Sequence, residues 1–311
     1  MENLIFMGTP DFAVPTLKSL HVSRHKISAV VTNIDKRGGR GRKLISPKVK
    51  QVAENLGYDV IQPEKLNSIK FLDKIKSLNP SLIIVVAFKK LPRELYEIPD
   101  YGAVNIHASL LPKYRGAAPI HHAILNGEKQ TGLTTFKINE RIDTGKIINQ
   151  RKIKIKQDDT TGSLWAKLSN LGGSIILETI DCLEKNSFNF KIQENQKATN
   201  APKIKPDDLR INWKNAAEKI HNQIRAFSPK PGAYSILNGK RIKFFNSSVN
   251  YQFEINKNNK PGYIYSDKNS FTIVTGNGAL EIFEIQPEGK SRMAIKNYLA
   301  GNRIVSGTML R

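Results

Sequence analysis

Seven consecutive apolar residues, LIIVVAF, occupy positions 82–88 of the chain. A short run of this kind, rich in β-branched side chains, is typical of a strand buried on both faces of a parallel sheet. Other apolar runs lie before and after it, and stretches with helical spacing separate them. The apolar runs are at 3–7, 28–32, 103–106 and 133–138, and the helical stretches at 12–20, 47–56 and 118–125. This alternation predicts an α/β domain with a mostly parallel sheet and right-handed crossovers.

The second half of the chain has a different pattern. After a predicted helix at 216–225, short segments with strand-like composition follow one another, at 234–237, 241–245, 262–265, 271–274 and 279–285. Turns rich in Asn and Gly separate several of them. Closely spaced short strands of this kind predict a small β-barrel, and the oligonucleotide-binding (OB) type is the natural candidate.

The boundary between the two halves follows from a long helix and the polar stretch after it. Residues 161–184 have helical spacing throughout, whereas 195–208 are polar and contain Pro202 and Pro206. Such a stretch is typical of a connection between domains. We therefore predict an α/β domain at 1–190, a linker at 191–207 and a barrel domain at 208–311.

Composition excludes several classes of protein. Cys182 is the only cysteine among 311 residues, so a disulfide scaffold is excluded and a reducing compartment is expected. The run at 82–88 is too short to cross a bilayer, and the first residues lack the features of a secretory signal. We expect a cytoplasmic protein without membrane contact, or one of an organellar matrix if a presequence has been removed.

Positive charge is the first functional signal. Lys and Arg number 49 against 27 Asp and Glu, which gives a net charge of +22. A nucleic-acid partner would explain this excess, and so would a Lys-rich surface that is merely solvated. The densest cluster is DKRGGRGRK at 35–43, where Arg and Lys alternate with Gly. We predict that it contacts phosphates through Arg37, Arg40, Arg42 and Lys43, although an exposed turn is the simpler interpretation.

Candidate catalytic residues follow a predicted strand in VNIHASLLPKYRG, at 104–116. Asn105 and His107 are two residues apart, so they project from the same side of that strand, near its carboxyl end. An amide donor and an imidazole there could polarise one carbonyl and stabilise an oxyanion. Asp143, in the turn RIDTG, could orient the imidazole and accept a proton. On spacing alone, a His packed in a loop is the more common interpretation of His107, and a structural Asp in an Asx-turn is a common interpretation of Asp143.

Other chemistries find less support in the sequence. His121 and His122 are adjacent and cannot both face one ion from a helix, so we expect no metal site. A nucleophile elbow, a Walker loop and a complete dinucleotide fingerprint are all absent. Cys182 lies among apolar residues of a predicted helix and is more typical of a core residue than of a nucleophile.

These stretches resemble the formyltetrahydrofolate-dependent formyltransferases. The resemblance is carried in the first half by FMGTPDF at 6–12, NIH at 105–107, SLLP at 109–112, RGAAPI at 115–120 and DTG at 143–145. In the second half, the segments that are similar to members acting on methionyl-tRNA are 198–203, 224–234, 286–290 and 299–301. The resemblance extends over essentially the whole chain.

The resemblance implies a Rossmann-like formyltransferase domain followed by a tRNA-binding, OB-like β-barrel. The implied donor is 10-formyltetrahydrofolate and the implied acceptor is the α-amine of methionine on initiator tRNA. Asn105 and His107 would stabilise the oxyanion, while Asp143 would hold the His and help to move the proton. The folate would lie against Ser109, Leu110, Leu111 and Pro112. Neither a metal nor a nucleotide cofactor is implied, and we expect a monomer.

The resemblance also implies that the basic loop contacts the acceptor end of the tRNA. Arg40 stands at the position where the family has an arginine. Two departures concern Arg37, where the family usually has Pro, and 89–92, where many members have a Tyr-Gly segment. Alternatives at this point are a sugar-nucleotide N-formyltransferase, hydrolysis of the formyl-folate, and a non-catalytic RNA-binding protein.

Overall fold

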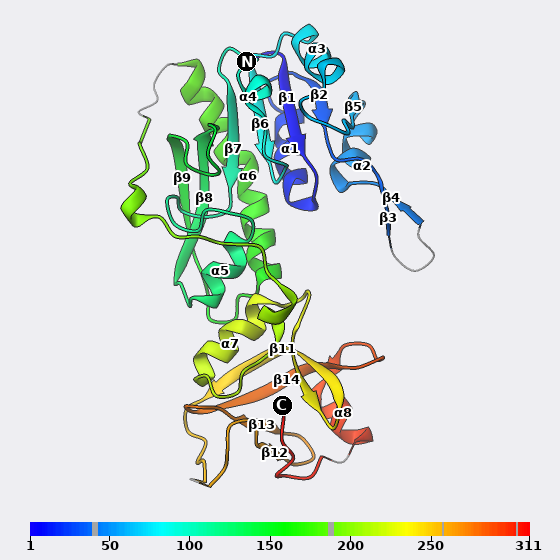
Figure 1. Cartoon of the computed structure of the whole chain (residues 1–311), viewed down its shortest axis with the longest axis vertical. Helices are drawn as coiled ribbons and strands as arrows, with labels where there is room; N and C mark the ends of the chain where they lie inside the picture. The colour runs from blue at the N-terminus through cyan, green and yellow to red at the C-terminus, as the bar shows by residue number, and fades with distance from the viewer. Residues whose placement is uncertain (39–42, 186–189, 257, 303) are drawn as a thin grey trace. The chain divides into compact units, whose positions relative to one another are not determined.

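The computed structural model describes the whole chain except residues 39–42, 186–189, 257 and 303. The described chain forms two compact units, each assembled from separate segments. The first unit contains Met1–Pro119, Gln130–Ile153 and Trp165–Pro202. The second contains Ile120–Lys129, Lys154–Leu164 and Lys203–Arg311. Each unit has its own sheet and its own core (Figure 1).

A seven-stranded sheet forms the centre of the first unit, in the order β5-β2-β1-β6-β7-β8-β9. The five strands from β5 to β7 are parallel to one another, and β8 runs antiparallel to β7. The strands are β1 (Leu4–Gly8), β2 (Ile27–Val31), β5 (Val60–Ile61), β6 (Leu82–Val86), β7 (Ala103–His107), β8 (Gln130–Lys137) and β9 (Ile147–Lys154). The predicted α/β domain with a mostly parallel sheet is therefore confirmed.

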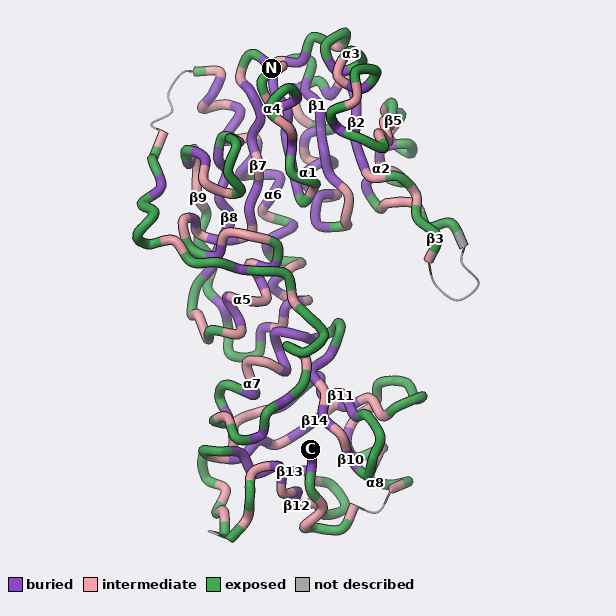
Figure 2. The backbone as a smooth tube through the Cα atoms, viewed as in Figure 1, coloured by how far each residue is buried: buried purple, intermediate pink, exposed green. Residues whose placement is uncertain are grey.

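Helices cover both faces of this sheet. On one face, α3 (Ile69–Ser77) and α4 (Arg93–Tyr96) bury side chains such as Phe71, Ile75 and Leu95 against alternate residues of the strands. Figure 2 shows β1, β6 and β7 as largely buried, as the apolar run of β6 predicts. The sheet is thus a central layer, and its carboxyl edge is left for loops that carry polar residues.

On the other face, α6 (Thr161–Glu184) packs along α1 (Val14–His21). Trp165 meets Phe12 edge to face with 5.0 Å between ring centroids, and the Ser169 hydroxyl donates to the Phe12 carbonyl at 2.9 Å. Farther along α6, Thr179 contacts Thr135 of β8. The predicted helix at 161–184 is confirmed over its full length. The remaining helices of the first unit are η1 (Asp11–Ala13), α2 (Lys48–Asn55) and η2 (Asn195–Lys197), whereas α5 (Pro119–Leu125) belongs to the second unit from Ile120 on.

The second unit contains a six-stranded antiparallel sheet. The order is β10-β11-β14-β13-β12, and β15 pairs with β14. Its elements are η3 (Pro206–Leu209), α7 (Ala217–Ala226), β10 (Ala233–Leu237), β11 (Lys240–Asn250), β12 (Ile264–Ser266), β13 (Phe271–Val274), β14 (Ala279–Pro287), β15 (Met293–Ala294) and α8 (Ile295–Gly301). Within the described residues, no pairing joins β10 to β12, so the predicted OB-like barrel is a curled and partly open one.

An apolar core holds this second sheet together. Phe227, Phe244 and Phe271 are among its largest fully buried side chains. Trp213 packs edge to face on Phe244 and donates its indole N–H to Ser235 at 3.0 Å, so the polar end of a buried ring is satisfied. In the portion of the chain that the structure describes, no helix has both the length and the apolar character needed to cross a membrane.

Candidate active site

The carboxyl end of β7 carries the first two candidate residues. Asn105 lies opposite Phe136 of β8 and His107 opposite Thr134, so both project from the same face of the sheet, as the two-residue spacing predicts. The intervening Ile106 and its partner Thr135 point to the α6 side, where Thr135 contacts Thr179. Asn105 and His107 therefore face the loops beyond the sheet and not the long helix.

His107 uses one ring nitrogen for structure. Its Nε2 lies 2.8 Å from the Tyr114 carbonyl oxygen, and a carbonyl only accepts, so Nε2 must carry a hydrogen. The other nitrogen, Nδ1, lies 3.7 Å from Oδ2 of Asp143. The ring is 6% exposed, which limits competition from water. Nδ1 is therefore the ring atom available for proton transfer, and a carboxylate stands beside it.

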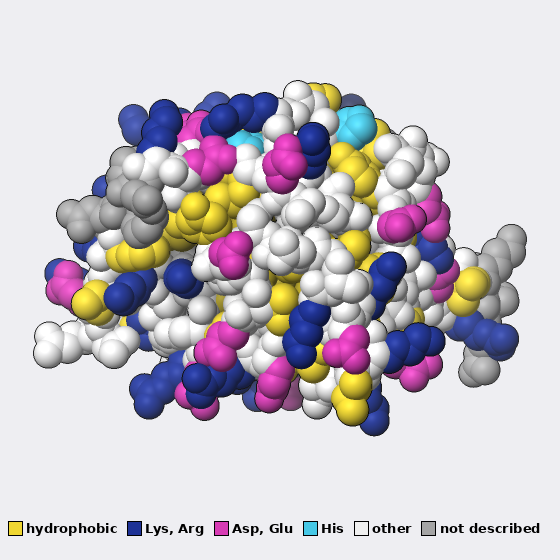
Figure 3. Space-filling view, turned by 90° about the horizontal axis from the view of Figure 1, so that it is seen from above, with side chains coloured by type: hydrophobic (Ala, Val, Ile, Leu, Met, Phe, Trp, Pro, Cys, Tyr) yellow, Lys and Arg dark blue, Asp and Glu magenta, His cyan; other side chains and the backbone are white. Residues whose placement is uncertain are grey.

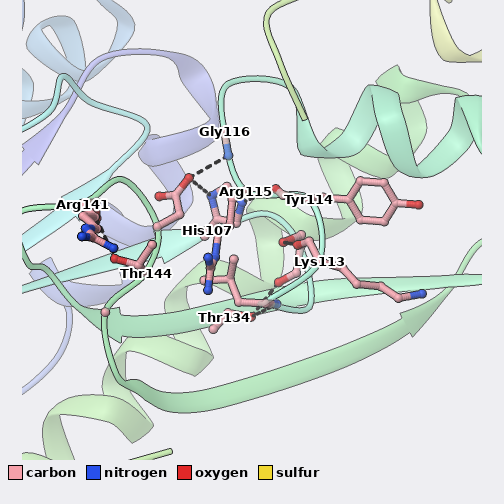
Figure 4. A network of polar contacts seen from close by, with 12 residues as sticks. His107, Lys113, Tyr114, Arg115, Gly116, Thr134, Arg141 and Thr144 are labelled. Carbon is pink, nitrogen blue, oxygen red and sulfur yellow. Dashed lines mark hydrogen bonds and ion pairs between the residues drawn. The ribbon is translucent and has the colours of Figure 1, made fainter. Parts of the chain in front are cut away.

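Asp143 reaches this position from an unusual backbone conformation. Its φ is +54°, in the left-handed region that L-residues other than Asn and Asp rarely adopt. Oδ2 also accepts a hydrogen bond from the Gly116 N–H at 2.8 Å (Figure 4). Gly116 itself has φ +124°, and a Cβ there would lie 2.6 Å from the Ala201 carbonyl oxygen, so only glycine fits. The carboxylate is thus held between a backbone amide and the His107 ring.

Asn105 completes the group brought together at this edge. Its side chain is half-buried, and within the described residues its amide has no hydrogen-bond partner. An uncommitted amide beside a His–Asp pair is free to donate to a substrate oxygen. The three residues can therefore supply hydrogen-bond donors to one oxygen and an acceptor for one proton.

The loop at 109–112 is fixed by contacts to β8 and β9. Ser109 and Leu111 are buried, and the Leu111 N–H donates to the Thr134 hydroxyl, which in turn donates to the Ser109 carbonyl. Gln150 donates to the Leu111 carbonyl at 2.9 Å and to Thr134. Of the four predicted folate-contacting residues, Leu110 and Pro112 remain half-buried with surface to offer, whereas Ser109 and Leu111 hold the loop.

Several residues that support the site were not found from the sequence. Thr134 and Gln150 support the loop at 109–112, and Arg115, Gln193 and Thr199 support the segment around Asp143 and Gly116. Burial lowers the pKa of the Arg115 guanidinium, and the charge of Asp143 acts in the opposite direction. Their roles depend on which strands and loops meet in three dimensions, and no local spacing signals that.

The predicted basic loop forms a projecting hairpin of β3 (Lys36–Gly38) and β4 (Lys43–Ile45) (Figure 1). Lys36 and Arg37 are exposed, and so is the apolar side chain of Leu44 opposite Arg37. Two of the four predicted contacts, Arg40 and Arg42, lie outside the described residues, and Lys43 is described only as part of β4. The hairpin follows β2, three strands from β7, or about 14 Å along the sheet.

One group of described residues has the composition of a metal site, His25, Asp181 and Glu184. It lies before β2 and at the end of α6, away from the carboxyl edge that carries His107. Arg24 pairs with both carboxylates, which explains their position without an ion.

Comparison with known families identifies what these two units are. A family model described as formyl transferase matches residues 2–180, and one described as formyl transferase, C-terminal domain, matches residues 203–303. This chain belongs to the formyl transferase family. Membership makes it a transferase enzyme, and the matched ranges include the whole His107–Asp143 region and the barrel.

Relatives within the formyl transferase family match over nearly the full length. Methionyl-tRNA formyltransferase of Thermodesulfovibrio yellowstonii is 47% identical over 98% of this chain and 98% of the relative. The protein of the same name from Caldanaerobacter subterraneus is 43% identical over 99% of both chains.

Solved structures of the formyl transferase family share the fold. An N-formyltransferase from Helicobacter canadensis, solved with folinic acid and dTDP-3-aminofucose, superposes with a TM-score of 0.68. It is 24% identical, and the match covers 92% of this chain and 100% of that one. Methionyl-tRNA formyltransferase from Clostridium thermocellum gives a TM-score of 0.57 at 21% identity, over 81% and 96% of the two chains.

Proposed function

We propose that this chain transfers the formyl group of 10-formyltetrahydrofolate to the free α-amino group of methionine on initiator tRNA. The observation that carries the proposal is the pairing of His107 with Asp143 beside Asn105 at the carboxyl edge of the sheet. The relatives named methionyl-tRNA formyltransferase, which match both units at 43–47% identity, support the choice of acceptor.

The reaction makes one bond and breaks one. The amine nitrogen adds to the formyl carbon, negative charge develops on the formyl oxygen, and the bond from that carbon to N10 of the folate then breaks. One proton must leave the amine and one must reach N10, so no net proton is consumed. A catalyst needs donors for the oxygen and a relay for the proton.

Asn105 and His107 are proposed to stabilise the oxygen. The Asn105 amide can donate in its neutral state, since its hydrogens are uncommitted. His107 donates from Nδ1 only when the ring is protonated, because Nε2 already serves Tyr114. Oδ2 of Asp143 lies 3.7 Å from Nδ1, so the His–Asp pair can take a proton from the amine and deliver it toward N10.

The loop at 109–112 is proposed to hold the folate. Contacts from Thr134 and Gln150 fix its backbone, so Leu110 and Pro112 offer a preformed apolar surface to a flat ring system. Ser109 and Leu111 would act by keeping that surface in place. A formyl-folate donor is consistent with solved members of the fold, one of which is described in complex with tetrahydrofolic acid.

The hairpin at 36–45 is proposed to contact the acceptor end of the tRNA through Arg37, Arg40, Arg42 and Lys43. Support comes from the exposure of Arg37 and from the position of the hairpin on the same edge of the sheet as His107. We further propose that 1–190 act as the catalytic domain, 191–207 as the linker and 208–311 as the tRNA-binding barrel. The protein would work as a monomer in the cytoplasm, with neither a metal nor a membrane.

The experiment that tests this function is a formyl-transfer assay with labelled 10-formyltetrahydrofolate. The acceptors are methionyl-tRNA of the initiator and of the elongator type, an amino-sugar nucleotide, and buffer alone. We expect label on initiator methionyl-tRNA and much less on the other acceptors. Transfer to the sugar nucleotide, release of formate in buffer, or no transfer at all would each overturn the proposal. The sugar and hydrolytic alternatives are not favoured, since the tRNA-named relatives span nearly the whole chain.

A further inference from the structure

Gln193 is buried in a segment whose neighbours are exposed. It is 6% exposed, whereas Ile192 beside it is 73% exposed and Glu194 is also exposed. A polar side chain that turns inward while an adjacent isoleucine turns outward must be held by specific hydrogen bonds.

The contacts of Gln193 use both ends of its amide. Nε2 has two hydrogens, and it donates to the Asp143 carbonyl at 2.9 Å and to the Gly145 carbonyl at 2.8 Å. Oε1 accepts from the Arg115 guanidinium, from Nε at 3.1 Å and from Nη2 at 2.7 Å. The chemistry fixes this orientation, because the reversed amide would set its oxygen against two carbonyls and its nitrogen against a cation.

The two carbonyls that Gln193 binds belong to the turn that presents Asp143. The Asp143 carbonyl defines ψ of that residue, so anchoring it fixes the direction in which the side chain leaves a backbone already at φ +54°. A left-handed conformation of this kind costs on the order of 1 kcal/mol or more and persists only where surrounding contacts enforce it.

Arg115 connects Gln193 to the other partner of the carboxylate. The Arg115 N–H donates to the Thr199 carbonyl, and its side chain also donates to Asn195. The next residue, Gly116, supplies the N–H that binds Oδ2 of Asp143. Gln193 therefore joins the two backbone segments that meet at this carboxylate, the turn at 143–145 and the loop at 114–116.

We propose that Gln193 is a positioning residue for formyl transfer, which holds the Asp143 turn so that the carboxylate faces Nδ1 of His107. The polar segment after α6 then contributes to the active site and does more than connect two parts of the chain. This inference rests on the proposed function of the Asn105, His107 and Asp143 group.

A matched pair of variants tests it, Gln193→Glu and Gln196→Glu. Both change one amide in the same segment to a carboxylate, but Gln196 is exposed. At position 193, a glutamate side chain has nearly the volume of glutamine and keeps the contact with Arg115. It has no N–H group to donate to the carbonyls of the turn at 143–145. We expect Gln193→Glu to lower kcat by about 10²-fold, with KM for tRNA and folate within about twofold of wild type. Gln196→Glu should match wild type.

A second measurement does not depend on activity. The ¹⁵N chemical shifts of the His107 ring, assigned with His107→Asn, report the tautomer and the hydrogen bonds of that ring. They should change in Gln193→Glu and stay unchanged in Gln196→Glu. If the wild-type protein does not transfer formyl to tRNA, the proposed function is wrong. The His107 shifts still show in that case whether Gln193 positions Asp143 beside the ring.

Three results would overturn the inference. The first is a kcat of Gln193→Glu within twofold of wild type, the second is a loss expressed mainly in KM, and the third is a low kcat with unchanged His107 shifts. Should Gln193→Glu not fold, Arg115→Lys replaces it, because a lysine cannot reproduce the fork to Oε1. The same pattern of kcat and His107 shifts is then expected, and its absence counts against the inference.

Discussion

His107 shows how one residue combines a structural and a chemical task. Nε2 is committed to the Tyr114 carbonyl, so ring orientation is fixed by the loop that follows β7. Nδ1 faces Asp143, which itself is held by Gly116. The sequence offers Asn105 and His107 as candidates at a strand end and Asp143 as a candidate in a turn, and the resemblance gives all three their catalytic roles. Gln193, Thr134 and Gln150 could not be predicted, because their partners are 16 to 78 residues away in the chain.

Replacing His107 tests its chemical task. His107→Gln can keep a donor, its Nε2, for the Tyr114 carbonyl but removes the imidazole nitrogen that exchanges a proton beside Asp143. We expect kcat to fall by about 10²–10⁴-fold, as for loss of a general acid–base group, while tRNA affinity stays near that of wild type. Turnover and a filter-binding titration measure the two quantities. A parallel loss of tRNA binding would reassign His107 to structure.

Gly145 tests how closely the Asp143 turn packs. A Cβ at this position would lie 1.7 Å from the Lys137 carbonyl oxygen, and backbone cannot yield as a flexible side chain can. Gly145→Ala should therefore destabilise the fold by about 3 kcal/mol or more in urea unfolding. Gly301→Ala is the control, because nothing lies within 4 Å of its added Cβ. Equal stability of the two variants would contradict this account of the turn.

At the scale of elements, the base of the basic hairpin is anchored by one carboxylate. Asp35 accepts hydrogen bonds from Lys50 at 2.8 Å, Ser46 at 3.0 Å and Gln62 at 2.8 Å. These donors, Lys50 first, lower the pKa of Asp35. Residues 35 and 46 are the two ends of the hairpin, so the carboxylate joins them to each other and to α2. The direction of the hairpin is thus set at its base.

Asp35→Asn should weaken that anchor, because its amide nitrogen would face either the donors of Lys50 and Ser46 or the donor of Gln62. We expect KM for initiator tRNA to rise several-fold, with KM for the folate unchanged, since the hairpin and the folate loop are separate. Asp73→Asn on α3 is the matched control, as it removes the same charge from an exposed site. An equal rise in both variants would show that net charge alone is responsible.

Element boundaries were predicted best where the local pattern is strong. The helix at 161–184 and the strand at 271–274 match the structure residue for residue, because each carries a sustained local pattern. The strand expected at 82–88 ends at Val86, since Ala87 turns to φ +49°. The pairs β3–β4 and β14–β15 were not predicted, because two- and three-residue strands owe their existence to their partners.

At the scale of the molecule, the net charge of +22 results from 49 Lys and Arg against 27 Asp and Glu. Figure 3 shows one face on which Lys and Arg side chains alternate with Asp and Glu instead of forming a single patch. That face favours the interpretation of a solvated Lys-rich surface, and the phosphate contact of the basic hairpin stays a prediction. The division into two parts was predicted from the change in pattern. The inclusion of 120–129 and 154–164 in the second unit depends on contacts between distant segments.

The stability of the second unit should depend on His221. Burial lowers the pKa of this ring, which contacts Ser247 and the Gln157 carbonyl. Because the pKa of His221 is lower in the folded state, the unfolded chain binds more protons at pH values below the pKa of an unfolded histidine, about 6.5. The free energy of unfolding therefore decreases as the pH falls below that value. His221→Gln should flatten this decline in urea unfolding between about pH 6.5 and pH 5. Parallel pH dependences of the two proteins would contradict it.

The central claim is that Asn105, His107 and Asp143 perform formyl transfer to initiator methionyl-tRNA. The most direct test is the single-turnover rate with saturating 10-formyltetrahydrofolate for wild type and Asp143→Asn, which keeps an acceptor for Gly116 and removes the charge beside His107. We predict rapid transfer by wild type and a rate lower by about 10²-fold or more in the variant, with tRNA still bound. Equal rates in the two proteins would contradict the account.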